Sequence, residues 1–400
     1  MRLVFWISAL TVVYVYAGYP LLLACWAWLR PSAAPRPAAP ADDLPTVSIV
    51  IAARNEAARL PARIENLLAL DYPADRRQII VVSDGSSDDT LRVLAAFGSA
   101  VEAIDAPPRG KAAALNAGVA RATGTILVFA DARQMFAPDA VRELVAPFAD
   151  PEVGGVTGEL LLDCEASDVA GRRAGSERRR LWSDRRTRED RGAGRRLDID
   201  RRGRIVSTIA EGVGLYWTYE KRLRSWESCI DSTLGATGAI YALRRALYQP
   251  LPDRTILDDV LTPMRAVLAG YRVVFSGRAF AFDRAAVDAD AEQRRKVRTL
   301  AGNVQILWQE PRLLVPVLNR VWLQYVSHKL GRLIVPYALL ALFAASVALA
   351  ERAAVYTLAL IAQCALYLLG GYGAWLEHRA SRRAHLLSTP TVTAERIVNA

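Results

Sequence analysis

The sequence is poor in histidine and cysteine, and the positions of both exclude common kinds of active site. The histidines are His328, His378 and His385, and the cysteines are Cys25, Cys164, Cys229 and Cys364. No two cysteines have the spacing of metal ligands, so we expect buried small apolar side chains instead. Because no histidine precedes residue 328, we expect neither a histidine-containing zinc site nor a Ser-His-Asp triad before that point.

Motifs for nucleic-acid recognition are also missing. There is no zinc-finger spacing, no aromatic RNA-binding strand and no basic region followed by heptads. The formal net charge of +10 therefore does not indicate nucleic acid as a partner. A basic protein with apolar segments more commonly faces anionic membrane lipids, and we expect lipids as partners.

Long apolar segments are present at both ends of the chain. Residues 3–29 carry no charge and exceed the roughly 20 residues that span a bilayer. A cleaved signal peptide is the alternative, but its apolar region is usually about 7–15 residues long. We therefore expect an uncleaved transmembrane anchor over residues 1–30, followed by a Pro- and Ala-rich linker over 31–45.

The C-terminal part has a second set of apolar segments. Residues 311–332 mix apolar, aromatic and basic side chains and predict an interfacial amphipathic helix. Residues 333–376 predict two transmembrane helices joined by a turn at Glu351 and Arg352. Residues 377–400 form a basic tail, which the positive-inside rule places in the cytoplasm together with the region after the first span. Three spans agree with this orientation, and we expect a multi-pass protein of a bacterial-type cytoplasmic (inner) membrane.

The middle region, residues 46–310, alternates between β-branched runs and amphipathic stretches. The expected strands are 46–52, 79–83 and 125–130, and the expected helices are 56–70, 90–97 and 112–121. This alternation predicts an α/β domain with a mainly parallel sheet covered by helices. An arginine-rich insertion over 163–204 interrupts it. We interpret the insertion as a solvated flexible loop or, alternatively, as a contact to lipid headgroups or an anionic acceptor.

Polar motifs follow the expected strands. The first strand ends in small residues such as Ala52, which let a ligand approach the backbone. The second ends in Asp84, whose carboxylate can accept hydrogen bonds from a base or ribose. Lys111 follows a glycine at a helix start, an arrangement that suits a diphosphate. Asp131 ends the third strand and is a candidate ligand for a divalent cation.

Each motif alone also has a structural explanation, such as helix capping after Asp84. Their order and spacing resemble the inverting family-2 glycosyltransferases, in particular the membrane-bound branch near cellulose, hyaluronan and poly-N-acetylglucosamine synthases. The resemblance covers roughly residues 45–307 apart from the insertion. It implies an α/β fold with a Rossmann-like mixed sheet of the glycosyltransferase A type, flanked by N- and C-terminal transmembrane helices, with the catalytic domain in the cytoplasm. The implied nucleotide-sugar-binding residues are Ala52, Arg54, Glu56, Asp84, Lys111, Asp131 and Arg133, with Mg²⁺ or Mn²⁺ on Asp131.

The second half of the same family is also visible, in an acceptor-side strand at residues 235–245, an acidic pair at 258–259 and a Gly-Tyr-Arg turn at 270–272. By this resemblance Asp259 is the general base. The alternative is a helix start made acidic to suit the helix dipole. The residues implied on the acceptor side are Thr237, Gly238, Asp258, Gln293, Arg294 and Lys296.

Two positions depart from the family pattern. The metal motif is often Asp-any-Asp, but Arg133 stands at its last position. Asp131 is then the sole carboxylate of that motif on the metal, or Arg133 neutralises phosphate directly. The synthases also carry Gln-any-any-Arg-Trp, whereas the stretch that begins at Gln293 has no tryptophan. Since that aromatic stacks on a growing polymer, its absence argues against long-chain processive synthesis.

The resemblance leaves the product open. The first hypothesis is an inverting, metal-dependent hexosyltransferase that moves a sugar from a nucleotide diphosphate sugar to a glycan or lipid-linked acceptor in exopolysaccharide or cell-envelope synthesis. The second is a polyprenyl-phosphate glycosyltransferase that makes a lipid-linked monosaccharide. The third is a non-enzymatic transporter subunit or scaffold with an inactive fold, against which the presence of both Asp131 and Asp259 argues.

Overall fold

The structure is a computed structural model that describes residues 1–29, 44–162, 218–283 and 289–388. The arginine-rich insertion, most of the linker and the end of the tail lie outside these residues. The chain forms two compact units. The smaller unit consists of Met1–Pro20, Ala286–Leu300 and Ser327–Ala400, and the larger unit consists of Leu21–Ala285 and Ala301–Val326.

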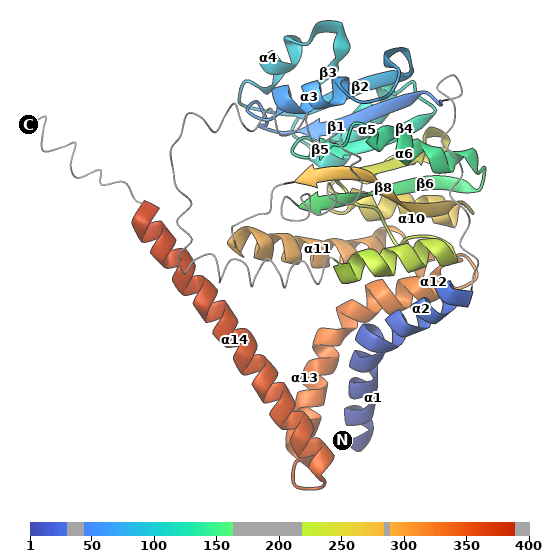
Figure 1. The fold of residues 1–400 in the computed structure, drawn as a ribbon. Helices are drawn as coiled ribbons and strands as arrows, with labels where there is room; N and C mark the ends of the chain where they lie inside the picture. The colour runs from blue at the N-terminus through green and yellow to red at the C-terminus, as the bar shows by residue number, and fades with distance from the viewer. Residues whose placement is uncertain (30–43, 163–217, 284–288, 389–400) are drawn as a thin grey trace, which may run out of the picture. The chain divides into compact units, whose positions relative to one another are not determined.

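The larger unit is built on one eight-stranded sheet with the strand order β3-β2-β1-β4-β7-β6-β8-β5 (Figure 1). The strands are β1 (Val47–Ala53), β2 (Arg77–Asp84), β3 (Glu102–Ala106), β4 (Ile126–Asp131), β5 (Met135–Phe136), β6 (Val153–Leu162), β7 (Ile240–Arg244) and β8 (Arg272–Asp283). The first four strands pair in parallel, whereas β7 is antiparallel to both β4 and β6. This arrangement confirms the predicted α/β class with a mixed sheet.

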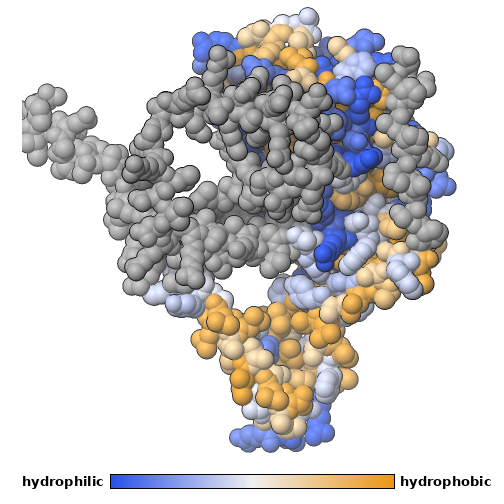
Figure 2. Space-filling model, viewed as in Figure 1, coloured by the Kyte–Doolittle hydropathy of each residue, from blue (hydrophilic) through white to orange (hydrophobic). Residues whose placement is uncertain are grey.

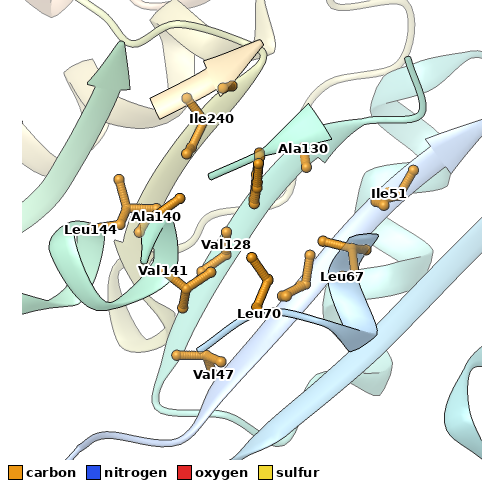
Figure 3. Close-up of a cluster of buried hydrophobic side chains, with 14 of the residues drawn as sticks. Val47, Ile51, Leu67, Leu70, Val128, Ala130, Ala140, Val141, Leu144 and Ile240 are labelled. Carbon is orange, nitrogen blue, oxygen red and sulfur yellow. The ribbon is translucent and has the colours of Figure 1, made fainter. Parts of the chain in front are cut away.

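Helices cover both faces of the sheet. They include α3 (Leu60–Leu68), α4 (Thr90–Ala95), α5 (Lys111–Arg121), α6 (Ala140–Val145) and α10 (Asp258–Leu268). Of α11 (Ala289–Gln309), only the part from Ala301 belongs to this unit. Successive strand residues point to opposite faces, so each strand contributes to two apolar layers. In the first apolar layer, Ile51 packs with Leu67 of α3 and Leu144 of α6 (Figure 3). In the second apolar layer, Val50 packs with residues of α5 and α10. Burial on both faces explains why these strands read as continuous β-branched runs.

The expected strands and helices before residue 131 are present, with shifted ends. The helix expected over 56–70 begins only at Leu60. Residues 56–59, expected as the first turn of this helix, are instead part of a loop. The backbone N–H groups of Glu56 and Ala57 donate to the side chains of Thr90 and Asp88, respectively.

The apolar helices lie at both ends of the chain, and most of their residues belong to the smaller unit, although residues 21–29 and 322–326 belong to the larger one. The helix α1 (Arg2–Val13) continues through a π-helical turn (Tyr14–Gly18) into α2 (Tyr19–Leu29). Phe5 packs edge-on against Tyr356 with the ring centroids 4.7 Å apart, in a cluster with side chains of α13 (Gly331–Leu349). Many other apolar side chains of these helices are exposed, as Figure 2 shows on its visible face.

Among the described residues, three helical stretches are long and apolar enough to cross a membrane, which is the number that the sequence predicts. They are Arg2–Leu29, Trp322–Leu349 and Ala354–Gly373. The last stretch lies within α14 (Ala354–Ser388), which extends beyond the predicted end at residue 376.

The amphipathic helix expected over 311–332 is not a single helix. A 3₁₀ turn (Pro311–Leu314) is followed by an irregular stretch, and α12 (Trp322–Gln324) then runs through a π-helical turn (Tyr325–Leu330) into α13. The irregular stretch is stabilised by Asn319, which donates to the carbonyl of Leu313 and accepts from the N–H of Val321. Leu313 and Val321 are buried in the second apolar layer, and residues 311–326 belong to the larger unit. The candidate span begins at Trp322, earlier than predicted.

Candidate active site

The carboxyl ends of β1 and β4 lie side by side and form one edge of a cavity. Ala52 on β1 is in register with Asp131 on β4. A cavity of about 260 Å³ opens there and is lined by Ala52, Glu56, Arg59, Asp131, Ala132, Arg133 and Gln134. Four of the seven predicted donor-binding residues, Ala52, Glu56, Asp131 and Arg133, therefore line a single cavity. This is the position at which α/β sheets usually bind ligands.

The loop after β1 is held by the loop after β2. Asn55 has a φ of 56°, in the left-handed region. Its side-chain Oδ1 accepts from the N–H of Ser87 at 2.8 Å, and its own N–H donates to Ser86 at 3.1 Å. Glu56 also pairs with Arg59 at 2.7 Å, and this hydrogen bond raises the pKa of Arg59. Arg54 is exposed at the edge of this loop.

Asp84 is buried at the end of β2 and holds the loop that begins α5. Its Oδ1 accepts from the backbone N–H groups of Arg109 and Gly110, both at 2.9 Å. One carboxylate oxygen thus fixes the position of Lys111, the next residue. The predicted contact of Asp84 with a nucleoside stays a prediction, and its contact with the diphosphate-side loop is a role that the sequence did not reveal.

Lys111 contacts a predicted donor-side carboxylate and a predicted acceptor-side carboxylate. Its Nζ lies 3.0 Å from Oδ1 of Asp131 and 3.2 Å from Oδ1 of Asp258. Burial alone lowers the pKa of Lys111, but the negative charges of Asp258, Asp131 and Asp259 outweigh burial and hold the pKa above its usual value. The ammonium group is therefore charged at neutral pH and lies between carboxylates of both halves of the site.

The acidic pair lies at the first turn of α10. Asp258 is only 3% exposed, and its Oδ2 has no hydrogen-bond partner among the described residues. Asp259 lies beside the strand entry before β7, where its backbone carbonyl accepts from the N–H of Ala236 at 2.6 Å. A Cβ added to Gly238 would lie 2.9 Å from Oδ2 of Asp259, so the missing side chain at residue 238 leaves room for this carboxylate.

Thr237 is a structural part of the same entry. Its N–H donates to Oγ1 of Thr157 at 2.8 Å, and its own Oγ1 accepts from Arg224 at 2.5 Å. The other predicted acceptor-side residues, Gln293, Arg294 and Lys296, are exposed on the part of α11 that belongs to the smaller unit. Their role stays a prediction.

Arg133 has a carboxylate partner that the sequence did not reveal. Its NH2 group lies 2.6 Å from Oδ2 of Asp283, which also accepts from Nε2 of Gln134 at 3.0 Å. Asp283 ends β8 and belongs to no motif that the sequence displays. The Arg133 side chain is still half exposed at the cavity, so it can contact an anion while it is paired.

The site fits a divalent cation only together with a phosphate-containing donor. The described residues contain no group of three or more histidine, cysteine, aspartate and glutamate side chains that could hold a metal. Mg²⁺ is commonly bound by one or two carboxylates together with substrate phosphates. Asp131 can serve as that carboxylate, because its side chain is 38% exposed and Lys111 contacts one of its two oxygens.

Comparison with known proteins agrees with this geometry. Residues 48–198 match the family model Glycosyl transferase family 2. The chain contains a family 2 glycosyltransferase domain. The family resemblance predicted from the motifs is thus confirmed.

Two curated relatives are glycolipid and polysaccharide synthases. The β-monoglucosyldiacylglycerol synthase of Synechocystis is 31% identical over 139 residues, which cover 33% of this chain and 29% of that protein. The poly-β-1,6-N-acetyl-D-glucosamine synthase of Staphylococcus aureus is 32% identical over 121 residues, which cover 29% of each chain. The match thus spans about three tenths of the length of these relatives.

One solved structure covers nearly the whole chain. A mannosyltransferase from Pyrobaculum calidifontis, in complex with GDP-Man and Mn²⁺, superimposes with a TM-score of 0.63 at 21% identity over 93% of this chain and 94% of that one. This likeness confirms the predicted fold of the glycosyltransferase A type, including the flanking apolar helices.

Proposed function

We propose that this protein is a membrane-anchored, inverting glycosyltransferase that moves a sugar from a nucleotide diphosphate donor to a glycan or lipid-linked acceptor. The observation that carries the proposal is the position of Lys111, between Asp131 at the donor cavity and Asp258 beside Asp259. A cation that contacts both carboxylates places the developing diphosphate charge next to the acceptor-side base. The family 2 match supports the same reaction.

The proposed reaction is a single displacement. Asp259 takes the proton from the acceptor hydroxyl as its oxygen attacks the anomeric carbon, and the bond to the diphosphate breaks. Lys111 turns from the carboxylates toward the leaving diphosphate and stabilises its charge. Arg133 contributes a second positive charge at the cavity. A divalent cation held by Asp131 would add Lewis-acid stabilisation of the same diphosphate.

The acceptor stays open between two chemical classes. A relative that makes a glycolipid and one that makes a polysaccharide are similar to the same part of the chain. The absence of the tryptophan after Gln293 favours short products or single transfers over long processive chains. Thin-layer analysis of radiolabelled lipid products separates the alternatives, because a polyprenyl-phosphate acceptor gives one alkali-sensitive monosaccharyl lipid.

We further propose a multi-pass protein of a bacterial-type cytoplasmic membrane with the catalytic domain in the cytoplasm. Three candidate spans and the arginines that follow the first and last of them support this orientation. A reporter enzyme active only outside the cytoplasm, fused after residue 388, should be inactive. An active reporter there would contradict the orientation.

The decisive experiment is a donor screen on purified membranes, scored by release of nucleoside diphosphate, followed by the Asp259→Asn variant. This variant should lose transfer to the acceptor and bind the donor with nearly unchanged affinity, because Asp259 accepts a proton and does not hold the nucleotide. Asp75→Asn is the matched control, since Asp75 is an exposed carboxylate in the turn that precedes β2. Normal turnover by Asp259→Asn would show that the base is another group.

A further inference from the structure

Residues 250–257 form a loop that leads directly into Asp258 and Asp259, and we call this segment the 250–257 loop. The helix α5, which begins with Lys111, holds one end of the loop through Asn116. Oδ1 of Asn116 accepts from the N–H of Leu251 at 2.8 Å, and Nδ2 donates to the carbonyl of Leu251 at 2.9 Å. The donor-side helix and the loop before the acidic pair are therefore joined by two hydrogen bonds from one side chain.

The other end of the loop is held by Gln305 on α11. Oε1 of Gln305 accepts from the N–H of Ile256 at 2.9 Å, and Nε2 donates to the carbonyl of Arg254 at 3.0 Å. Arg254 has a φ of 61°, a left-handed conformation that costs free energy in a residue other than glycine. The amide of Gln305 thus fixes the loop at the strained residue and two residues before Asp258.

Gly302 lets α11 approach this loop closely. A Cβ at residue 302 would lie 2.5 Å from Cγ of Leu257 and 3.1 Å from Cγ2 of Ile256. Gly302 and Gln305 are three residues apart, so they lie on the same face of the helix. The helix α11 therefore packs closely against the loop, and the side chain of Gln305 hydrogen-bonds to the loop backbone.

The loop also makes an ion pair, between Arg109 and Asp253, that is exposed to solvent. Its atoms lie 2.6 Å apart, but both side chains are more than half exposed, at 61% and 58%. Exposed ion pairs of this sort contribute little to stability. The loop is held instead by the hydrogen bonds of Asn116 and Gln305. Further hydrogen bonds run from Arg265 to the carbonyl of Pro250 at 3.1 Å and from Gln309 to Oγ1 of Thr255 at 3.2 Å.

We propose that Gln305 is a positioning residue for the general base. Together with Asn116 it holds the 250–257 loop, and the loop fixes the carboxylates of Asp258 and Asp259 relative to Lys111. Gln305 acts through the loop and does not contact the reacting atoms. This inference rests on the proposed function, in which Asp259 takes the proton of the acceptor.

The test compares three single variants of the full chain in native membranes or detergent. Gln305→Ala should lower kcat for transfer about 10- to 100-fold, because misplacement of a reacting group by about 1 Å has an effect of that size. Its Kd for the donor should stay within about twofold of the parent value. Gln305→Glu keeps the acceptor for Ile256 but loses the donor to Arg254. Its kcat should lie between those of Gln305→Ala and the parent. Val304→Ala, at the neighbouring exposed position on α11, should match the parent.

A double variant separates positioning from general destabilisation. If Gln305 acts only through the base, Gln305→Ala should cause no further loss of transfer in an Asp259→Asn background. Multiplicative losses in the double variant, an equal loss of donor affinity, or an unchanged kcat in Gln305→Ala would each overturn the proposal.

Hydrogen exchange tests the same contact without any substrate. Gln305→Ala should speed exchange of the Ile256 amide, while amides of β4 keep the parent rate. Unchanged exchange at Ile256 would overturn the inferred hold on the loop. A parent chain that transfers no sugar from any donor would instead refute the proposed function, and the exchange experiment distinguishes these two failures.

Discussion

The carboxylate of Asp259 lies against the backbone of Gly238, where an added Cβ would come within 2.9 Å of Oδ2 and 3.5 Å of Cγ. The atoms that would collide belong to the end of a side chain, so Gly238→Ala should displace the carboxylate without preventing folding. We expect transfer to fall at least about 10-fold, with a similar melting temperature and donor affinity. Gly277→Ala on β8 is the control, because its Cβ would make ordinary contacts at 3.4 Å. Unchanged transfer by Gly238→Ala would argue against Asp259 as the base.

Lys111 should control donor affinity through its charge. In Lys111→Met the buried Asp258 loses its cationic partner and the diphosphate loses a positive group. We expect the Kd for the donor to rise about 10- to 100-fold, since a hydrogen bond to a charged group contributes about 1.5–3 kcal/mol. Lys111→Arg should retain part of the affinity. Calorimetric titration with nucleoside diphosphate measures both, and parent-like affinity in Lys111→Met would contradict the proposed role.

Removal of divalent cations tests the two modes of phosphate neutralisation. If Asp131 holds Mg²⁺ or Mn²⁺, a chelator should abolish transfer and weaken binding of nucleoside diphosphate. Asp131→Asn should raise the cation concentration needed for half-maximal binding about 10-fold or more. Full activity and unchanged nucleotide binding in the presence of chelator would favour the alternative, in which Lys111 and Arg133 neutralise the diphosphate themselves.

Stability at acid pH should depend on Glu310. Its carboxylate accepts from Arg312 at 2.6 Å and from Arg265 at 3.2 Å. Burial acts to raise the pKa of Glu310, but the hydrogen bonds and charges of the two arginines outweigh it and lower the pKa. A carboxyl group with a lowered pKa in the folded state stabilises the protein above its unfolded pKa of about 4.3, and this contribution disappears as the pH falls further.

Melting temperatures between pH 7 and pH 3 measure this contribution. Glu310→Gln should melt lower than the parent at pH 7, and the difference should shrink as the pH falls below the usual glutamate range. Glu65→Gln, an exposed position on α3, should follow the parent curve. A difference that stays constant over the whole range would show that Glu310 stabilises the fold by packing alone.

Arg63 is fully buried beside Phe136 of the first apolar layer. The effect of replacing it on stability should depend on the size of the new side chain. Its NH1 donates to Asn66 and its guanidinium stacks on Phe136, but Nε and NH2 have no hydrogen-bond partner among the described residues. Burial lowers the pKa of Arg63 to about 9, against the opposing effect of Asp131. Replacement of a buried charge by an apolar side chain of similar length is often neutral or stabilising.

Two variants separate charge from volume at this position. Arg63→Met should keep or raise the melting temperature, whereas Arg63→Ala leaves a cavity and should lower stability by about 2 kcal/mol or more. Equal destabilisation by both variants would show that the charge itself stabilises the protein. Donor binding by Arg63→Met then tests whether this charge acts on Asp131.

Much of the parallel half of the sheet could be predicted from sequence. The runs that became β1, β2 and β4 are buried on both faces, so hydrophobicity alone marks them. β2 and β4 end in the aspartates that the motif analysis singled out, and Ala52 is the last residue but one of β1. The strands of the other half, in which parallel and antiparallel pairs are mixed, were less visible. β6, β7 and β8 pair across an insertion and over long sequence separations, and such pairing leaves little local signal.

The sequence predicted the site residues that stand at strand ends. It did not predict the contacts between residues that are far apart in the sequence. Asp131 and Lys111 were singled out separately, but the contact of Lys111 with Asp258 depends on how α5 and α10 pack on the same face of the sheet. The pairing of Arg133 with Asp283 joins strand ends that are 150 residues apart. Gln305 lies in a helix whose pattern gives no reason to expect contact with the 250–257 loop.

Gly302 also defines where this chain can be recombined with its relatives. The contact with Leu257 leaves no space for a side chain, so α11 cannot slide by one residue along the 250–257 loop without a collision. The boundary between the two units falls within α11, between Leu300 and Ala301. A chimera joined at that boundary keeps residues 302–309 together with the 250–257 loop that they contact. A junction a few residues later would combine the loop of one protein with the α11 residues of another, and should yield a folded but inactive hybrid.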